Sequence, residues 1–312
     1  MKKLPIDPLL YEEMILCEDI ICEKPFARQY RRFFQERKFL KMESWLNLRR
    51  PALIHFFGPD GSGKTTQVDI LLRQLLSKGV PAKKGWIRSP HTLAFVFAML
   101  FLKIGLYRTS STQLGKLANN SPLEKQPINV KGQSTNLPPW DIRINPWRKV
   151  SYDRDGNAVV CERIPAVNSN SFLRWFWAVT ELVSVLPLIF YRVYFKLLLG
   201  YSVVAERCIV DTVTTIAYFV DDVEFIRSPV ARVLINCIPR HTMFIFLDSD
   251  YDTLLKRRSF NVEVKRFIEF QRKAYYYFSH SFGALAIDTS MFSVEDTATM
   301  ISQYVALAPS FH

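Results

Sequence analysis

The chain has 312 residues, of which 49% are hydrophobic and 14% aromatic, and it carries a formal net charge of +12 at pH 7. This composition is typical of a globular protein with ample apolar material for a core, either one large domain with insertions or one domain with a small appendage. Its five cysteines (17, 22, 161, 208 and 237) include no Cys-x-x-Cys pair. The odd number and the spacing argue against a disulfide framework and a metal site, so we expect a cytoplasmic protein.

The positive charge is concentrated in one part of the chain. Residues 70–150 contain 13 Lys or Arg residues and only two acids, Glu124 and Asp141. Because such a surface attracts polyanions, its candidate partners are nucleotides, nucleic acids and anionic lipid headgroups. The alternative is a solvated basic face without a dedicated partner. We predict no specific nucleic-acid binding.

Residues 1–50 alternate charged and apolar residues at roughly helical period. This pattern predicts an N-terminal extension of two helices that pack on the outside of the domain. Acidic residues interrupt the apolar stretch near its start, which is not typical of a signal peptide.

The segment "FFGPDGSGKTTQ", which begins at Phe56, matches the phosphate-binding pattern G-x-x-x-x-G-K-[ST]. An apolar run of strand length precedes it, and leucines at helical spacing follow it as far as Lys78 and Gly79. A strand, a glycine loop and a helix form the context that this motif requires. We expect Lys64 to reach the β- and γ-phosphates of ATP and Thr65 to bind Mg²⁺. The predicted nucleotide-binding residues are Gly58, Pro59, Asp60, Gly61, Ser62, Gly63, Lys64, Thr65 and Thr66.

The next segments are less regular. "VPAKKGWIRSP" predicts a second strand and a turn that carries Arg88, and residues 92–107 are almost wholly apolar. Residues 108–170 are rich in Ser, Thr, Asn and Pro and are predicted to form an insertion. Within it, "WRKVSYDRDGNAVVCER" predicts a β-hairpin with its turn at Asp155-Gly156.

A long apolar helix is predicted around residues 175–191, which include one acid, Glu181, and one proline, Pro187. The central acid and the length of 17 residues argue against a membrane span, for which about 20 apolar residues are needed. We favour a helix buried against the sheet and a subunit partner in a homodimer. The alternative is a helix that lies at a bilayer surface, because Trp residues flanked by Arg and Lys suit that position.

From residue 200 onward, strands and helices alternate. "YSVVAERC", "HTMFIFLDSD" and "ALAIDTS" are predicted strands, and a closing helix is predicted to begin after the cap residue Ser293. This order predicts an α/β protein, a P-loop NTPase with a three-layer α/β/α architecture and a doubly wound parallel sheet. In this interpretation residues 51–312 form a kinase domain with an insertion at about 108–170.

Several candidate site residues follow the strands. Glu206 and Arg207 end one strand, and Asp248 and Asp250 end another. We prefer Glu206 over Asp248 as the second Mg²⁺ ligand beside Thr65, and we expect Asp248 to orient the structure. The basic stretch "LLKRRSFNVEVKRF" predicts a mobile lid whose cations close over the transferring phosphoryl group. The predicted catalytic residues are Lys64, Arg257, Arg258 and Arg266, although a solvent-facing basic helix turn would also explain the arginines.

Four segments together resemble the thymidylate kinase family of nucleoside monophosphate kinases: "FFGPDGSGKTTQ", "GYSVVAERCIVD", "FIFLDSDYDTLLKRR" and "AIDTS". The resemblance covers about half of the chain. It implies transfer of a phosphoryl group from ATP to dTMP, with Mg²⁺ as cofactor. It also implies that Asp60 contacts the sugar of the acceptor nucleotide, that Arg88 binds the acceptor phosphate, and that Glu206 and Arg207 stand where the family has Asp-Arg.

The chain also departs from the family pattern. Glu206 is one methylene longer than the aspartate of the family, and Cys208 replaces an aromatic residue. The sequence that follows Arg88 is not the Glu-Pro-Gly-Gly stretch that usually shapes the phosphate site. Gly61 stands where some members of the family have a catalytic arginine. Members that lack this arginine use arginines of the lid instead. Two alternatives therefore stay open: a kinase at a membrane surface with a lipid- or sugar-linked acceptor, and a nucleotide-binding protein without catalysis.

Overall fold

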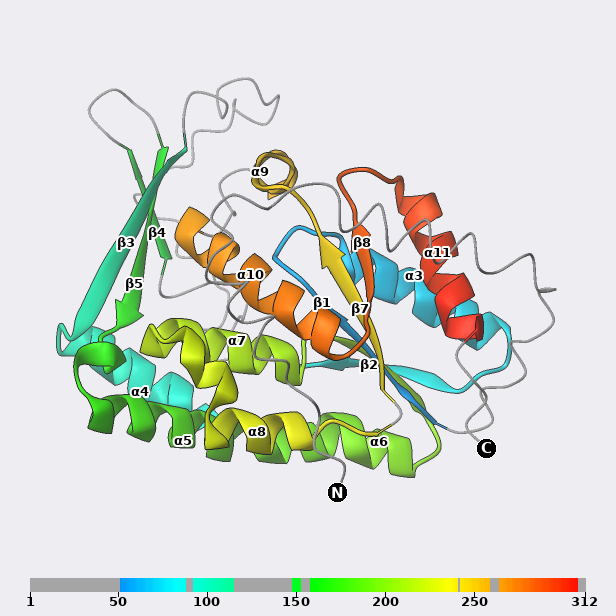
Figure 1. Cartoon of the computed structure of the whole chain (residues 1–312), viewed down its shortest axis with the longest axis horizontal. Helices are drawn as coiled ribbons and strands as arrows, with labels where there is room; N and C mark the ends of the chain where they lie inside the picture. Colours follow the sequence, from blue (N-terminus) through cyan, green and yellow to red (C-terminus); the bar gives the residue numbers. More distant parts are fainter. Residues whose placement is uncertain are drawn as a thin grey trace, which may run out of the picture.

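The computed structural model describes residues 51–87, 92–114, 148–152, 158–240, 242–258 and 264–307. These residues form an α/β protein built on a five-stranded parallel sheet with helices on both faces (Figure 1). The predicted parallel α/β sheet is confirmed, and the arrangement is compatible with three α/β/α layers. The predicted helices of residues 1–50, Arg88 and the predicted turn at Asp155-Gly156 lie outside the described residues.

The strand order in the main sheet is β2-β6-β1-β7-β8. The strands are β1 (Leu53–Phe57), β2 (Ala82–Trp86), β6 (Ser202–Glu206), β7 (Thr242–Asp248) and β8 (Leu285–Asp288). β1 lies at the centre, between β6 and β7, with Phe56 paired to Glu206 and Phe57 paired to Phe246. All neighbours are parallel, so the carboxyl ends of the strands meet at one edge of the sheet.

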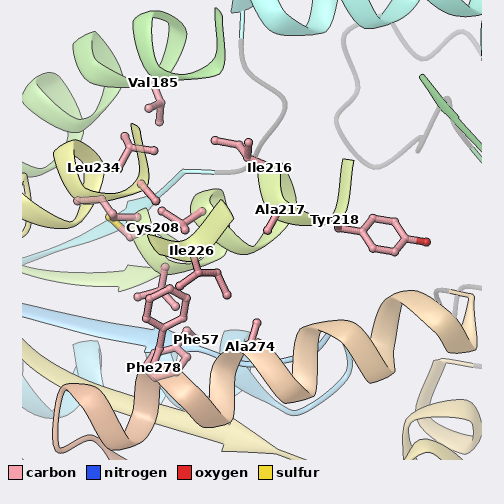
Figure 2. Close-up of a cluster of buried hydrophobic side chains, with 14 of the residues drawn as sticks. Phe57, Val185, Cys208, Ile216, Ala217, Tyr218, Ile226, Leu234, Ala274 and Phe278 are labelled. Atoms are coloured by element: carbon pink, nitrogen blue, oxygen red, sulfur yellow. The ribbon is translucent and has the colours of Figure 1, made fainter. Parts of the chain in front are cut away.

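Alternate residues of each strand enter two separate cores, because side chains in a strand point to opposite faces. Ile54 and Phe56 pack under α3 (Lys64–Ser77) and α11 (Val294–Leu307). Leu53 and Phe57 pack on the other face, under α7 (Ile209–Val220) and α10 (Lys265–Ser281). In Figure 2, Phe57 and Phe278 meet residues of α7 and of the outer helices in this second core.

Local signals fix the ends of these helices. α3 begins after Gly63, which has φ 87°, and Gly79 follows it at φ 75°. Ser293 caps α11 as predicted, since the Asp296 backbone N–H donates to Ser293 Oγ at 3.1 Å. α7 begins with a capping box in which the Cys208 backbone N–H donates to Asp211 Oδ2 at 3.2 Å.

An outer layer of helices covers the α7 side of the sheet (Figure 1). The predicted apolar helix runs from α5 (Ser171–Ile189) through a π-helical turn, η5 (Phe190–Tyr194), into α6 (Phe195–Leu198). α5 packs against α7 and α8, whereas η5 contacts β2 and α6 contacts β6 of the sheet. The helices α4 (Thr92–Lys103) and α8 (Pro229–Asn236) belong to the same layer. The remaining short elements are α9 (Tyr251–Arg258), η4 (Val167–Ser169) and η6 (Val223–Arg227).

Within the described residues, the stretch Ser171–Leu198 is the one helix long and apolar enough to cross a membrane. Its mean hydropathy is 1.5, and 39% of the apolar window is buried inside the protein. Length and composition alone are weak grounds for a span, since core helices share them.

A second, three-stranded antiparallel sheet stands at one end of the molecule, in the order β3-β5-β4 (Figure 1). β4 (Arg148–Tyr152) and β5 (Ala158–Pro165) form the predicted hairpin pairing. The strand β3 (Tyr107–Leu114) was not predicted. Its sequence, "YRTSSTQL", is polar and lacks a strong alternating pattern, and pairing with β5 supplies its order.

Candidate active site

A cavity of about 520 Å³ opens at the carboxyl ends of β1 and β6. Its wall combines the glycine loop, the start of α3, the ends of two neighbouring strands, and the loop after β8. The lining residues are Asp60, Gly61, Ser62, Gly63, Lys64, Thr65, Thr66, Gln67, Trp86, Glu206, Arg207, Arg257, Arg258, Thr289, Phe292, Ser293, Val294 and Thr297. The predicted loop residues thus line one cavity, except Gly58 and Pro59, whose carbonyl oxygens contact Lys64.

The glycine loop has a backbone that requires glycine at two positions. Gly58 has φ 147°, and a Cβ there would lie 2.0 Å from the carbonyl oxygen of Leu247 on β7. Gly61 has φ 95°, and a Cβ there would lie 3.0 Å from the side chain of Arg258. Both restrictions keep the loop close to β7 and α9, with the N-terminus of α3 facing the cavity.

Lys64 is buried and its ammonium lies beneath the loop. Nζ donates to the carbonyl oxygens of Gly58 and Pro59, at 2.7 Å each. It also lies 3.8 Å from Asp60 Oδ1. The lysine therefore fixes the loop and places a positive charge at the floor of the cavity.

Thr65 and Glu206, the two predicted metal ligands, are in direct contact. Thr65 Oγ1 donates to Glu206 Oε1 at 2.5 Å. Lys84 Nζ on β2 approaches the other carboxylate oxygen of Glu206 at 3.7 Å. Hydroxyl and carboxylate oxygens are the donors that Mg²⁺ prefers, and Mg²⁺ sites take only one or two carboxylates from the protein. This pair fits that ion.

The described residues contain no cluster of three or more His, Cys, Asp or Glu side chains that could hold a metal ion. A site for a metal that takes most of its ligands from the protein, such as structural zinc, is therefore not formed by them.

Burial raises the pKa of the Cys208 thiol to about 12, so this residue is a neutral thiol at physiological pH.

Asp60 gathers three cations at the loop. Its carboxylate is largely buried and lies near Lys64. It also pairs with Arg207, and Arg258 Nη1 lies 2.9 Å from Asp60 Oδ2. Arg207 has φ 59°, an uncommon backbone conformation for a residue with a side chain. That turn at the end of β6 aims its guanidinium at the loop. Asp60 thus forms ion pairs with three basic side chains in this structure.

Arg257 connects the loop to the segment after β8. It donates to Thr289 Oγ1 at 2.9 Å and to the Thr289 carbonyl at 2.6 Å. Thr289 Oγ1 in turn donates to the Ser62 carbonyl at 3.1 Å. Both Arg257 and Arg258 line the cavity.

Arg266 is not brought to the cavity. Its guanidinium pairs with Asp221 at 2.9 Å, at the end of α7. Asp221 also pairs with Arg108 of β3, so this cluster ties the small sheet to α10. The described part of the predicted lid places two arginines at the cavity, not three.

Two other arginines, on the long apolar helix, are also engaged away from the cavity. Arg192 donates to the Trp86 carbonyl at 2.5 Å, and Arg174 donates to the Asn168 carbonyl at 3.4 Å. Neither lines the cavity. Asp248 forms a bidentate pair with Arg272, at 2.8 to 3.1 Å, which agrees with its predicted orienting role.

A buried polar group lies under the site, on the α7 side. Asp211 accepts a hydrogen bond from Tyr275 Oη at 3.0 Å and lies 3.5 Å from His55 Nε2. Burial by itself raises the pKa of Asp211, but His55, Arg207 and Lys64 outweigh it, and the pKa lies below the ordinary aspartate value. Asp211 therefore stays ionised and adds negative charge beneath two cations of the site.

Sequence reasoning missed the walls of the cavity. Trp86, Thr289 and Phe292 line it. Thr289 stands in the segment "AIDTS" but was given no role, and Trp86 and Phe292 belong to no motif. Each follows or ends a strand of the sheet, and the strand order brings them beside the loop. Position at a strand end was the one signal that pointed to them.

No protein-family model matches this chain, and no curated protein matches it. The resemblance to the thymidylate kinase family therefore depends on the sequence motifs alone.

Proposed function

We propose that this protein is an ATP- and Mg²⁺-dependent kinase of the P-loop type, which transfers a phosphoryl group to a nucleoside monophosphate, most favourably dTMP to give dTDP. The contact between Thr65 and Glu206 carries the proposal. It joins the residue after the loop lysine to the end of the neighbouring strand, at the N-terminus of a helix, where phosphate and Mg²⁺ are bound together in such enzymes.

The loop geometry supports the ATP half of the reaction. Positive φ angles at Gly58, Gly61 and Gly63 are typical of a loop whose backbone N–H groups turn toward phosphate oxygens. The N-terminus of α3 adds a partial positive charge in the same place. The residues proposed to hold the phosphates are the loop residues with Lys64, and those proposed to hold Mg²⁺ are Thr65 and Glu206.

Bound Mg²⁺ supplies charge neutralisation and orientation of phosphate oxygens. The protein contributes position and electrostatics. Lys64, already fixed by two carbonyls, keeps a cation at the loop, and Arg257 and Arg258 flank it. Phosphoryl transfer needs in-line positioning and cations around the equatorial oxygens more than covalent help from the enzyme.

The sheet order supports an assignment of the two substrates to opposite sides of the loop. β2 and β8 are the two edges of the sheet, so Trp86 and Thr289 flank the loop from opposite directions. The resemblance places adenine near the last strand. We therefore assign the β8 side, with Phe292, to ATP, and the β2 side, with Trp86, Asp60 and Arg207, to the acceptor.

ADP release from ATP and Mg²⁺ with a panel of acceptors tests the proposal. The panel comprises dTMP, dUMP, other nucleoside monophosphates and a blank without acceptor. We expect release that depends on a nucleoside monophosphate and is fastest with dTMP. ATP binding without any monophosphate-dependent release would reject this acceptor class and favour the lipid- or sugar-linked acceptor or the non-catalytic role.

A further inference from the structure

The long helix Ser171–Leu198 presents an exposed apolar stripe along its whole length. Phe172, Trp175, Val183, Phe190, Phe195 and Leu198 are between 44% and 75% exposed. At 100° per residue the first four fall on one face. The π-helical turn of η5 inserts one extra residue, which brings Phe195 and Leu198 back to that face.

A second helix widens this face. α4 packs beside α5, with the rings of Phe97 and Phe176 in edge contact at 5.2 Å. Its own exposed residues include Val96 at 61% and Leu100 at 48%. Monomeric proteins rarely expose apolar patches of this extent, so a patch spread over two helices marks an interaction surface.

The two helices of this face carry no exposed acid, and Arg174 alone of their basic residues has an ion pair, with Asp222 at 3.9 Å, among the described residues. The described residues of α4 and of the helix Ser171–Leu198 contain a single acid, Glu181, which is fully buried. The basic residues of the same two elements, each exposed or partly exposed, are Lys103, Arg174, Arg192 and Lys196. A face of apolar and aromatic residues bordered by cations complements an anionic bilayer surface.

From these observations we propose that the face formed by α4 and the helix Ser171–Leu198 docks on an anionic membrane surface, with the long helix parallel to the bilayer. One tryptophan, Trp175, and one tyrosine, Tyr191, are exposed on this face, and such residues favour the headgroup boundary of a bilayer. A second copy of the chain is a poorer occupant, because a twofold contact would set the cations of these helices against each other, and neither helix has an exposed acid to pair them.

The helix lies on the bilayer in this proposal and does not cross it. Its opposite face buries Trp177, Val185 and Ile189 in the core, with Glu181 fully buried between them. A crossing helix would have to leave that core and would carry the acid into hydrocarbon. The same helix contacts the cavity wall through Arg192, which donates to the Trp86 carbonyl. The docking proposal does not rest on the proposed kinase activity.

Flotation of the full chain with vesicles tests the proposal without any catalytic readout. The probes are vesicles of phosphatidylcholine alone and of phosphatidylcholine mixed with phosphatidylserine. The wild-type chain should float with the mixed vesicles and less with the neutral ones. The double variant Trp175→Glu/Val183→Glu should lose about tenfold or more of this partition, since it removes apolar insertion and adds like charge. Both sites are exposed, so folding measured by circular dichroism should be retained.

The matched control is Leu76→Glu, at a residue 52% exposed on α3, a helix of the other sheet face. It should float like the wild type. Brominated lipids should quench part of the tryptophan fluorescence, and Trp175→Phe should float normally but lose part of that quenching.

Three results would overturn the proposal. No flotation by a monomeric wild-type chain would mean that another segment covers the face. Equal flotation of the double variant would mean that charge alone attracts the protein. A wild-type dimer that does not float, and that the double variant converts to monomer, would make a second copy the occupant.

Discussion

Thr65 and Glu206 are 141 positions apart in sequence, yet Thr65 Oγ1 in the first turn of α3 donates to Glu206 Oε1 at the end of β6, at 2.5 Å. We predict that Glu206→Gln lowers kcat/KM about 100-fold, because an amide binds Mg²⁺ less strongly than a carboxylate. Thr65→Ser keeps the hydroxyl and should retain most activity, whereas Thr65→Ala should not. Mg²⁺ titrations of turnover measure both effects, and full activity of Glu206→Gln at low Mg²⁺ would remove Glu206 from the metal site.

Lys64→Ala should abolish ATP turnover. The lysine acts as a cation held by the carbonyls of Gly58 and Pro59 and not as core, so the fold should stay intact by circular dichroism. Arg232→Ala, at an exposed residue of α8, is the matched loss of a cation elsewhere and should be neutral. Retained turnover in Lys64→Ala would refute the phosphate-loop assignment.

Replacing Arg257 and Arg258 together by alanine should lower kcat by about 100-fold and change ATP affinity much less, if the two cations act mainly in the transition state. Single-turnover rates and equilibrium ATP binding separate the two quantities. Arg266→Ala should have a smaller effect on kcat, because Arg266 pairs with Asp221 away from the cavity. A change confined to ATP affinity would make Arg257 and Arg258 binding residues only.

The glycine loop, its strand and its helix could be predicted from sequence because their signals are local. Gly58, Gly63 and Lys64 stand at fixed spacing, and the leucines of α3 mark its buried face. The contact of Glu206 with Thr65 followed from one further rule, that parallel strands end at one edge of a sheet.

The remaining features depend on partners distant in sequence. Arg266 and Arg258 look alike in the sequence, but Asp221, at the left-handed end of α7, pairs with the first and Asp60 with the second. The strand β3 depends on β5, and Trp86 reaches the cavity only through the order of β2 beside β6. Such pairings have no local pattern to predict them.

Asp211 should make the stability of the protein depend on pH on the acid side. Its pKa in the folded state lies below the ordinary aspartate value, so its stabilisation is complete above about pH 4 and is lost as the pH falls further. Asp211→Asn should lower the free energy of unfolding by about 1–3 kcal/mol at neutral pH, since it weakens contacts with Tyr275 and the Cys208 backbone.

Chemical denaturation at several pH values measures this prediction. The free energy of unfolding of the wild type should fall more steeply below about pH 4 than that of Asp211→Asn. Parallel slopes for the two proteins would show that Asp211 does not titrate differently in the folded and unfolded states.

The proposed reaction is phosphoryl transfer from ATP to a nucleoside monophosphate at the cavity beside Thr65 and Glu206. The most direct measurement is chromatographic detection of dTDP and ADP after incubation of the wild-type chain with ATP, Mg²⁺ and dTMP, beside Lys64→Ala. The wild type should give equal amounts of both products, and the variant should give neither. Absence of dTDP and of every other nucleoside diphosphate product across the acceptor panel would contradict it.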